Sequence, residues 1–279
     1  MKPLLVIGPL SKDLLIKDKT TNKVGGALYY QSFVFEKLNI PYTLVISLAK
    51  NDETLLNEFP DIHKIQHKFK NETITFTNKY INDKRVQYSN FADIPITIKE
   101  IQTIIKDNEY SAIILNPLLP TDFTKNFLQD LKKFNIPIYL SLQGFLRKSN
   151  KGKVELFKNQ DITEILSVVE GLFLDENEAN ILFEDNPLDV IAHDLSVLGP
   201  SEVIITRSDK GSLIYSNVSG EVLSVPPVKV ENVNYPTGSG DTFMAAYLSS
   251  RLDGYSINYS ANFASKLTSE KIEKGDLNL

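Results

Sequence analysis

The sequence contains no cysteine among its 279 residues. This absence excludes disulfide bonds, thiolate metal sites and cysteine nucleophiles, and it fits a reducing compartment. Histidine is also scarce, with only His63, His67 and His193. His63 and His67 are four residues apart and would lie close together only on a helix, whereas their segment has the alternation of a strand. We therefore expect no metal site built on histidine.

A basic surface and a long apolar segment are also missing. The formal net charge is −5 and the sequence pI is about 5.4, which argues against a nucleic-acid partner. The apolar run near the N-terminus, residues 4–8, is far too short for a signal peptide or a membrane span. We expect a cytoplasmic protein without nucleic-acid or membrane partners.

Apolar runs and helical segments alternate along most of the chain. Residues 4–8 and 43–48 are typical of strands buried on both faces, and residues 26–38 between them have helical spacing. Strand, helix and strand in this order predict a parallel sheet with crossover helices. The same rhythm predicts strands at 111–115, 137–142, 171–174 and 202–206, and helices at 121–134, 176–184, 187–198, 239–251 and 256–270. The expected fold class is α/β, a doubly wound and mostly parallel sheet with helices on both faces.

Residues 64–92 break this rhythm. Polar and apolar residues alternate there around an Asn82-Asp83 turn, which predicts a hairpin or meander with one wet face. Together with about residues 12–24, this segment is expected to form a small β lid over the main sheet. Residues 212–216 and 220–225 are expected to form an antiparallel pair. Because no repeat or linker is present, residues 1–279 are expected to form a single domain.

The sequence PTGSGDTFMAAYL at residues 236–248 carries the strongest chemical signal. Gly238, Ser239 and Gly240 form a turn that opens directly into an amphipathic helix, with Asp241 in the first helical turn. Glycines let the backbone turn sharply and bring its N–H groups close to a ligand, and the start of a helix favours an anion. An aspartate at this place also stabilises a helix by itself, so its residue type leaves a purely structural role open.

The segment TGSGDTF resembles the C-terminal signature of the ribokinase-like (PfkB) family, usually TGAGDTF. The resemblance implies an ATP-dependent kinase for a small molecule, with Mg²⁺ as cofactor and ATP as co-substrate. It also implies that Gly238, Ser239 and Gly240 form an anion hole for the transferring phosphoryl group, and that Asp241 is the general base. Phosphoryl transfer depends mostly on positioning and charge stabilisation, which suits donors and base on one rigid turn. No Walker-type or dinucleotide-binding glycine motif is present.

Segments near the N-terminus resemble the acceptor side of the same family. The first strand leads to Asp13, which matches the aspartate that binds substrate hydroxyls. Gly25 and Gly26 match paired glycines beside the substrate. By residue type alone, Asp13 could be a surface aspartate and the two glycines a simple turn.

Two later segments resemble the donor side. Asp175 and Glu178 stand where the family has an Asn-x-x-Glu element that acts on the magnesium–phosphate group, and a carboxylate can still hold magnesium or its waters. Thr206 and Gly211 match the nucleotide-binding Thr-x-Gly-x-x-Gly turn, with Ser208 in place of the first glycine. Without the resemblance, Asp175 and Glu178 would simply be a charged helix start.

Where the family has Asp-Thr-Thr before its glycine turn, this chain has Asn234, Tyr235, Pro236 and Thr237. The resemblance implies that this aspartate often helps to hold a monovalent cation. A tyrosine supplies no anionic oxygen, so weak or no activation by potassium is expected.

Three segments, GGALYYQS, LNPLLP and YLSLQGFLRKSNKG, resemble archaeal myo-inositol kinases, a branch of this family. The resemblance implies a neutral polyol as acceptor, with Gln143 and Arg147 at the substrate end; by residue type alone both fit a polar loop after a strand. A nucleoside kinase is an alternative, since aromatic side chains of the lid and Tyr29 and Tyr30 could stack on a base. A catalytically silent, ligand-binding family member is another alternative, and a homodimer is possible.

Overall fold

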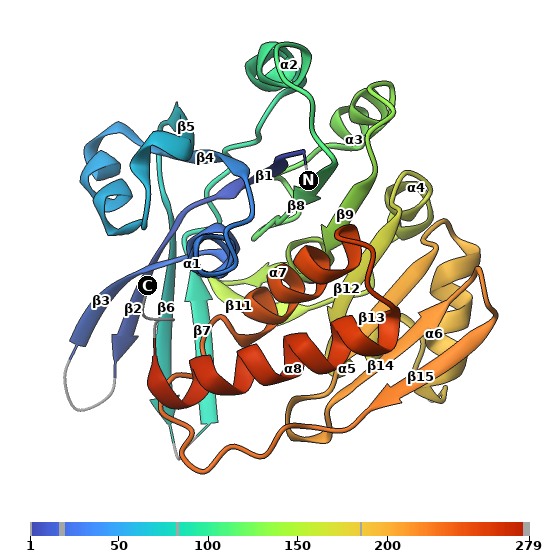
Figure 1. Cartoon of the computed structure of the whole chain (residues 1–279). Helices are drawn as coiled ribbons and strands as arrows, with labels where there is room; N and C mark the ends of the chain where they lie inside the picture. The colour runs from blue at the N-terminus through green and yellow to red at the C-terminus, as the bar shows by residue number, and fades with distance from the viewer. Residues whose placement is uncertain (1, 17–19, 82–83, 185, 276–279) are drawn as a thin grey trace.

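The computed structural model describes residues 2–16, 20–81, 84–184 and 186–275, and it contains two β-sheets (Figure 1). Within these residues the large sheet has the strand order β15-β14-β13-β12-β9-β8-β1-β4-β5. Its strands are β1 (Leu4–Pro9), β4 (Tyr42–Ala49), β5 (Ile65–Lys70), β8 (Ala112–Leu115), β9 (Ile138–Ser141), β12 (Gly171–Asp175), β13 (Glu202–Thr206), β14 (Ser212–Ser216) and β15 (Glu221–Val225). Neighbouring strands of this sheet pair in parallel across β5, β4, β1, β8, β9, β12 and β13. The last two strands, β14 and β15, pair antiparallel.

Helices cover both faces of this sheet, as the doubly wound pattern predicts (Figure 1). In one core cluster, helices α2, α3, α4, α5 and α6 pack on one face of the strands. In the other cluster, α1, α7 and α8 pack on the opposite face. Successive residues of a buried strand point to opposite faces, so Leu5 and Ile7 enter the first cluster while Leu4 and Val6 enter the second. The helices are α1 (Ala27–Lys37), α2 (Ile98–Lys106), α3 (Lys125–Lys132), α4 (Ile162–Leu166), α5 (Glu176–Leu182), α6 (Leu188–Val197), α7 (Ser239–Leu252) and α8 (Ile257–Lys274).

The second sheet has the order β10-β11-β7-β6-β2-β3 and forms a separate layer (Figure 1). Its strands are β2 (Ser11–Ile16), β3 (Thr20–Gly25), β6 (Ile74–Ile81), β7 (Lys84–Ser89), β10 (Arg147–Asn150) and β11 (Lys153–Leu156). Side chains from one face meet directly across three strands, because Asp13 pairs with Phe76 and Phe76 with Ser89. This sheet occupies the place in the sequence where a β lid was expected.

Two expectations about this sheet need correction. Residues 65–70 were expected in the lid but form β5, the edge strand of the large sheet, parallel to β4. Their alternation reflects an edge strand with one exposed face rather than a projecting hairpin. Conversely, β10 and β11 join the second sheet although no strand was predicted between residues 142 and 171. The expected Asn82-Asp83 turn and residues 17–19 lie outside the described residues.

Two short helices, α2 and α4, were also not predicted. The start of α2 is fixed by a capping box, in which Thr97 and Glu100 bond each other's backbone N–H groups. Within the part of the chain that the structure describes, no helix combines the length and apolarity needed to cross a bilayer.

Candidate active site

The predicted site residues lie at the carboxyl ends of the parallel strands. Asp13 follows β1, Gln143 follows β9, Asp175 ends β12 and Thr206 ends β13. Asp175 and Thr206 are direct register partners on adjacent strands. Ligands of open α/β sheets bind at this edge, so the topology gathers residues as far apart in the sequence as Asp13 and Thr206.

The glycine turn begins α7, as expected. Gly238 is the N-cap residue with a left-handed φ of 80°, a conformation that glycine adopts without steric cost. The side chain of Ser239 turns back, because its hydroxyl donates to the carbonyl of Pro236 at 2.6 Å, and its backbone N–H donates to the same oxygen at 3.3 Å. Gly240 and Asp241 follow in the first helical turn, where backbone N–H groups have no intrahelical acceptor.

Asp241 occupies an environment that disfavours its charged form. Burial and the negative charge of Asp13 raise the pKa of its carboxyl to about 6. The positive charges of Lys271 and Arg147 pull the pKa in the opposite direction. Charged side chains from β2, α8 and the start of β10 therefore act on the Asp241 carboxyl. A carboxylate with a pKa just below neutral is suited to general base catalysis.

Asp13 and Gly25 lie in direct contact, as the acceptor-side resemblance implies. A Cβ atom at Gly25 would fall 2.6 Å from both Asp13 Cγ and Ser11 Oγ. The Ser11 hydroxyl donates to Asp13 Oδ1 at 3.0 Å and fixes the carboxylate. Gly26, with a φ of 97°, is the N-cap residue of α1.

Arg147 lies at the centre of the charged groups, with 9% of its surface exposed. Its Nη1 donates to the Leu118 carbonyl at 3.1 Å, and its guanidinium lies 5.0 Å from the ring centre of Phe76. Its positive charge lowers the pKa values of Asp241, Glu178 and Asp122 against the effect of their burial. Gln143 is half-buried at the start of the 3₁₀ turn Gln143–Leu146, and its role remains a prediction.

Asp175 and Glu178 form a capping box at the start of α5. The backbone N–H of Glu178 donates to Asp175 Oδ1 at 2.8 Å, and that of Asp175 donates to Glu178 Oε2 at 2.9 Å. These two residues therefore cap the helix, which is the structural role expected of a charged helix start. In addition, burial and the charges of Asp175 and Asp241 raise the pKa of Glu178 to about 7.

This pair fits magnesium only as part of a larger coordination shell. Among the described residues, no group of three or more acidic or histidine side chains could hold a metal ion. The capping box uses one oxygen of each carboxylate, so Asp175 and Glu178 would supply at most the second oxygens, and phosphates and waters would supply the rest. A cation here would also relieve the repulsion that raises the pKa of Glu178.

The turn between β13 and β14 has the expected shape. Ser208 adopts a φ of 51°, so it takes a left-handed conformation at the place of the family's glycine. A Cβ at Gly211 would fall 2.1 Å from the carbonyl oxygen of Val225, so only glycine fits there. Thr206 ends β13, and Lys210 in the turn pairs with Glu176 at 3.1 Å.

Sequence reasoning missed several buried polar residues at this edge. Lys271 of α8 is 4% exposed, and Gln31 and Asn116 exchange two side-chain hydrogen bonds of 3.1 and 2.9 Å. Asp122 accepts from the backbone N–H groups of Leu118 and Leu119, and burial raises its pKa to about 7. A signal existed for Lys271, since it follows Ala264 and Leu267 on the apolar stripe of α8 at helical spacing.

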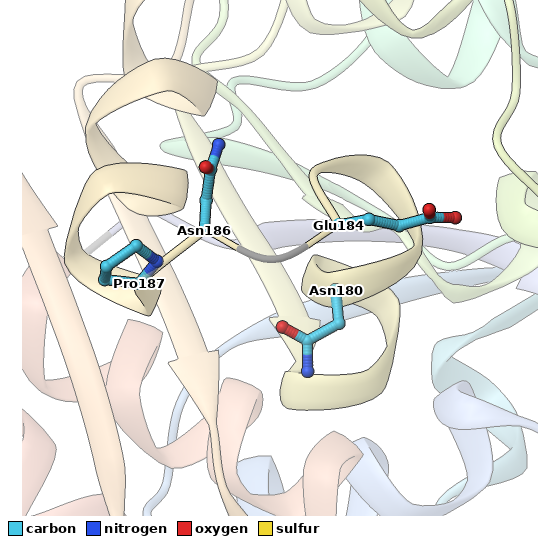
Figure 2. A pocket seen from close by; sticks show the side chains of 4 residues that line it. All are labelled: Asn180, Glu184, Asn186 and Pro187. Carbon is cyan, nitrogen blue, oxygen red and sulfur yellow. The ribbon is translucent and has the colours of Figure 1, made fainter.

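A hollow between α5 and α6 lies elsewhere, lined by Asn180, Glu184, Asn186 and Pro187. Figure 2 shows its polar side chains pointing in different directions rather than toward one point. It is open to solvent and contains none of the predicted site residues, so we assign the chemistry to the strand ends.

Comparisons with known proteins identify the family of the chain. The sequence profile of the pfkB family of carbohydrate kinases matches residues 97–278. A cytidine kinase of Thermococcus kodakarensis is 36% identical over 105 residues, which are 37% of this chain and 36% of that kinase. The matched segment therefore spans well under half of the relative's length.

Three solved structures share the fold at low identity. A pyrophosphate-dependent ribokinase-family kinase, complexed with a pyrophosphate analogue and myo-inositol, has a TM-score of 0.86 at 21% identity, covering 99% of this chain and 97% of that one. A second structure is that of a pyrophosphate-dependent myo-inositol-1 kinase, converted into a myo-inositol-3 kinase by replacing an asparagine and a serine with leucine. It has a TM-score of 0.83 at 20% identity, covering 99% of this chain and 95% of that one. An Arabidopsis thaliana ribokinase complexed with ribose and ATP has a TM-score of 0.77 at 16% identity, covering 98% of this chain and 94% of that one.

The solved structures establish the ribokinase-like fold, and the family profile covers more than half of the chain, including the glycine turn and Asp241. The chain therefore belongs to the pfkB family of carbohydrate kinases.

Proposed function

We propose that the protein transfers a phosphoryl group from a nucleoside triphosphate to a hydroxyl of a small neutral polyol or sugar, with myo-inositol favoured and Asp241 as the base. The observation that carries the proposal is that the charges of Asp13 and Arg147 act on Asp241 in the first turn of α7. The site thus combines a base, a hydroxyl-binding carboxylate and anion-stabilising charges within one charged cluster.

In the proposed reaction, Asp241 accepts the proton of the acceptor hydroxyl as its oxygen attacks the terminal phosphorus. The bond from that phosphorus to the leaving phosphate oxygen breaks as the new P–O bond forms. The backbone N–H groups of the Gly238, Ser239 and Gly240 turn and the guanidinium of Arg147 stabilise the charge on the phosphoryl oxygens. Magnesium, when bound beside Asp175 and Glu178, supplies further charge neutralisation to the phosphates.

The acceptor is proposed to lie on the face of the second sheet that carries Asp13. Its register places Asp13, Phe76 and Ser89 side by side, with Asn78 two residues farther along β6 on the same face. Asn78 and Ser89 are both buried, and Asn78 accepts from Gln87 Nε2 at 3.0 Å. Neutral hydrogen-bonding groups with one carboxylate suit hydroxyls and disfavour an anionic acceptor. The myo-inositol complex of a structural relative supports this choice.

A nucleoside acceptor is the main alternative, because the similar cytidine kinase acts on a nucleoside by its name. The two tyrosines that could stack on a base are engaged elsewhere, however. The ring of Tyr30 packs against Gly238, and Tyr29 makes edge contacts with Phe33 and Phe59. This packing favours the polyol.

Pyrophosphate is an alternative donor, because two of the structural relatives are described as pyrophosphate-dependent. The test is kcat/KM for myo-inositol, pentoses, hexoses and nucleosides, each with ATP and with pyrophosphate. We expect the highest value for myo-inositol with ATP. A nucleoside or a sugar phosphate ahead of every neutral polyol by tenfold would overturn the acceptor assignment. No transfer to any acceptor from either donor would favour the silent, ligand-binding alternative.

A further inference from the structure

Lys271 is a buried lysine on a helix whose neighbouring lysines are exposed. It has 4% of its surface accessible, whereas Lys266 and Lys274 of α8 are exposed. Burying an ammonium group is costly unless hydrogen bonds and charges compensate it. Such a residue needs a structural or chemical explanation, and its contacts give one.

The ammonium group holds the chain segment that leads into the glycine turn. Lys271 Nζ donates to the carbonyl oxygen of Tyr235 at 2.8 Å and also to that of Thr237. These two carbonyls flank Pro236 and immediately precede Gly238. Nearby, the backbone N–H of Tyr235 donates to the carbonyl of Ile272 at 3.0 Å, so the segment is tied to α8 at several points.

The same ammonium group is linked to the turn through Tyr30. Nζ lies 5.0 Å from the centre of the Tyr30 ring, a geometry in which a cation is attracted to the aromatic face. A Cβ at Gly238 would fall 2.3 Å from Cγ of this ring, so the ring and the turn are in close contact. Lys271, Tyr30 and Gly238 therefore fix one another's positions.

Lys271 also acts on the charge of Asp241. Of the two cations that oppose the effect of burial on the pKa of Asp241, Lys271 has the larger effect. Two carbonyl oxygens that converge on one place repel each other and repel a nearby carboxylate unless a cation lies among them. The lysine places such a cation there permanently.

We propose that Lys271 is a positioning residue for phosphoryl transfer: its tethered ammonium group orders the Tyr235–Thr237 carbonyls, sets the Gly238–Asp241 turn and supplies a fixed positive charge there. This proposal rests on the proposed function, in which Asp241 is the base. In this proposal the ammonium group of Lys271 occupies the position between the Tyr235 and Thr237 carbonyls that a free cation would otherwise fill.

The test compares K271M, which keeps the length of the side chain but removes its charge, with K266M on the exposed face of the same helix. We expect K271M to remain folded, to lose at least tenfold in kcat, and to shift the acidic limb of its pH–rate profile to higher pH. K266M should match the wild type in all three respects. In K271A, ammonium or methylammonium ions should restore part of the activity, because they can occupy the vacated space between the carbonyls. A folded K271M with wild-type kcat and an unmoved acidic limb would overturn the proposal, as would a K271A that no cation restores.

A second variant covers the case in which K271M does not fold. The chain has no cysteine, so K271C carries a single thiol that can be aminoethylated in the unfolded state to restore an ammonium group, or ethylated to a neutral counterpart. The aminoethylated protein should recover activity after refolding and the ethylated protein should not; equal activities would overturn the proposal.

A measurement without turnover separates this proposal from the proposed function. The carboxyl pKa of Asp241 can be followed by ¹³C NMR, with D241N identifying the signal. A higher pKa in K271M would support the role of Lys271 even if the wild type phosphorylated none of the acceptors, whereas an unchanged pKa would contradict it in an active kinase.

Discussion

Gly238 lies against the ring of Tyr30, so closely that a Cβ at position 238 would fall 2.3 Å from Tyr30 Cγ. A Cβ at Gly240, two residues on, would meet no atom within 4 Å. The two glycines of one turn are therefore constrained differently: one by its packing and its left-handed backbone, the other, in our proposal, by the phosphoryl group that must approach it.

We predict that G238A lowers the free energy of unfolding by about 1–3 kcal/mol, because it forces an alanine into a left-handed conformation and against a ring. G240A should leave the stability within about 0.5 kcal/mol of the wild type but reduce kcat at least tenfold, since its methyl group enters the space assigned to the phosphoryl group. Urea denaturation and steady-state kinetics of both variants test this. Wild-type kcat in G240A would remove Gly240 from the anion hole.

The pKa of Glu178 has a consequence for stability. Its pKa is about 7 in the folded protein against an ordinary value of 4.5, so the folded state binds this proton more tightly than the unfolded state. The resulting contribution to stability is fully present below about pH 4.5 and is lost as the pH rises through about 7.

We predict that E178Q gains stability relative to the wild type between pH 5 and pH 8, on the order of 1–3 kcal/mol, because glutamine carries no charge to desolvate. Chemical denaturation of both proteins at the two pH values, with the exposed E184Q as control, measures the difference. A pH-independent difference between E178Q and the wild type would show that Glu178 titrates normally.

Potassium should not activate the wild-type protein. The carbonyl oxygens of Tyr235 and Thr237 already accept hydrogen bonds from Lys271, and Tyr235 brings no carboxylate. We predict equal rates when potassium chloride replaces choline chloride at constant ionic strength. A several-fold increase specific to potassium would contradict this expectation and weaken the case for a tethered cation.

Asn78 tests the placement of the acceptor. We predict that N78L lowers kcat/KM for the preferred polyol at least tenfold or changes which hydroxyl is phosphorylated, with little effect on donor binding, because a buried hydrogen-bonding group is replaced by an apolar one of similar size. T77V, on the same strand but facing the other side of the sheet, is the matched control. Identical product and kcat/KM in N78L would place the acceptor elsewhere.

Much of this architecture is predictable from the sequence because its signals are local. Continuous apolar runs mark β1, β8 and β13, and the glycine turn at Gly238 marks the start of α7. The contact of Asp13 with Gly25 is not local in the same way, and the family resemblance indicated only that both residues lie on the acceptor side.

The missed features are those that tertiary context decides. The segment of β10 and β11 is polar and follows a strand; its two strands pair with each other, and Lys153 of β11 pairs with Tyr88 of β7. Lys271 has the residue type of a solvent-exposed side chain, and it is buried because the carbonyls of a loop 34 to 36 residues away face it. Edge strands such as β5 show the same alternation as a projecting hairpin, so their sheet could not be assigned in advance.

The central claim is that Asp241 is the base, and the pH dependence of kcat/KM in the wild type and in D241N tests it most directly. Because the pKa of Asp241 is about 6 and the base must be ionised, wild-type kcat/KM should rise with pH through about 6 and then level. D241N should remain folded and bind the donor, lose about 10²–10⁴-fold in rate, and lack this rise. A D241N variant that keeps more than about a tenth of the wild-type kcat, or the same acidic limb, would contradict the account.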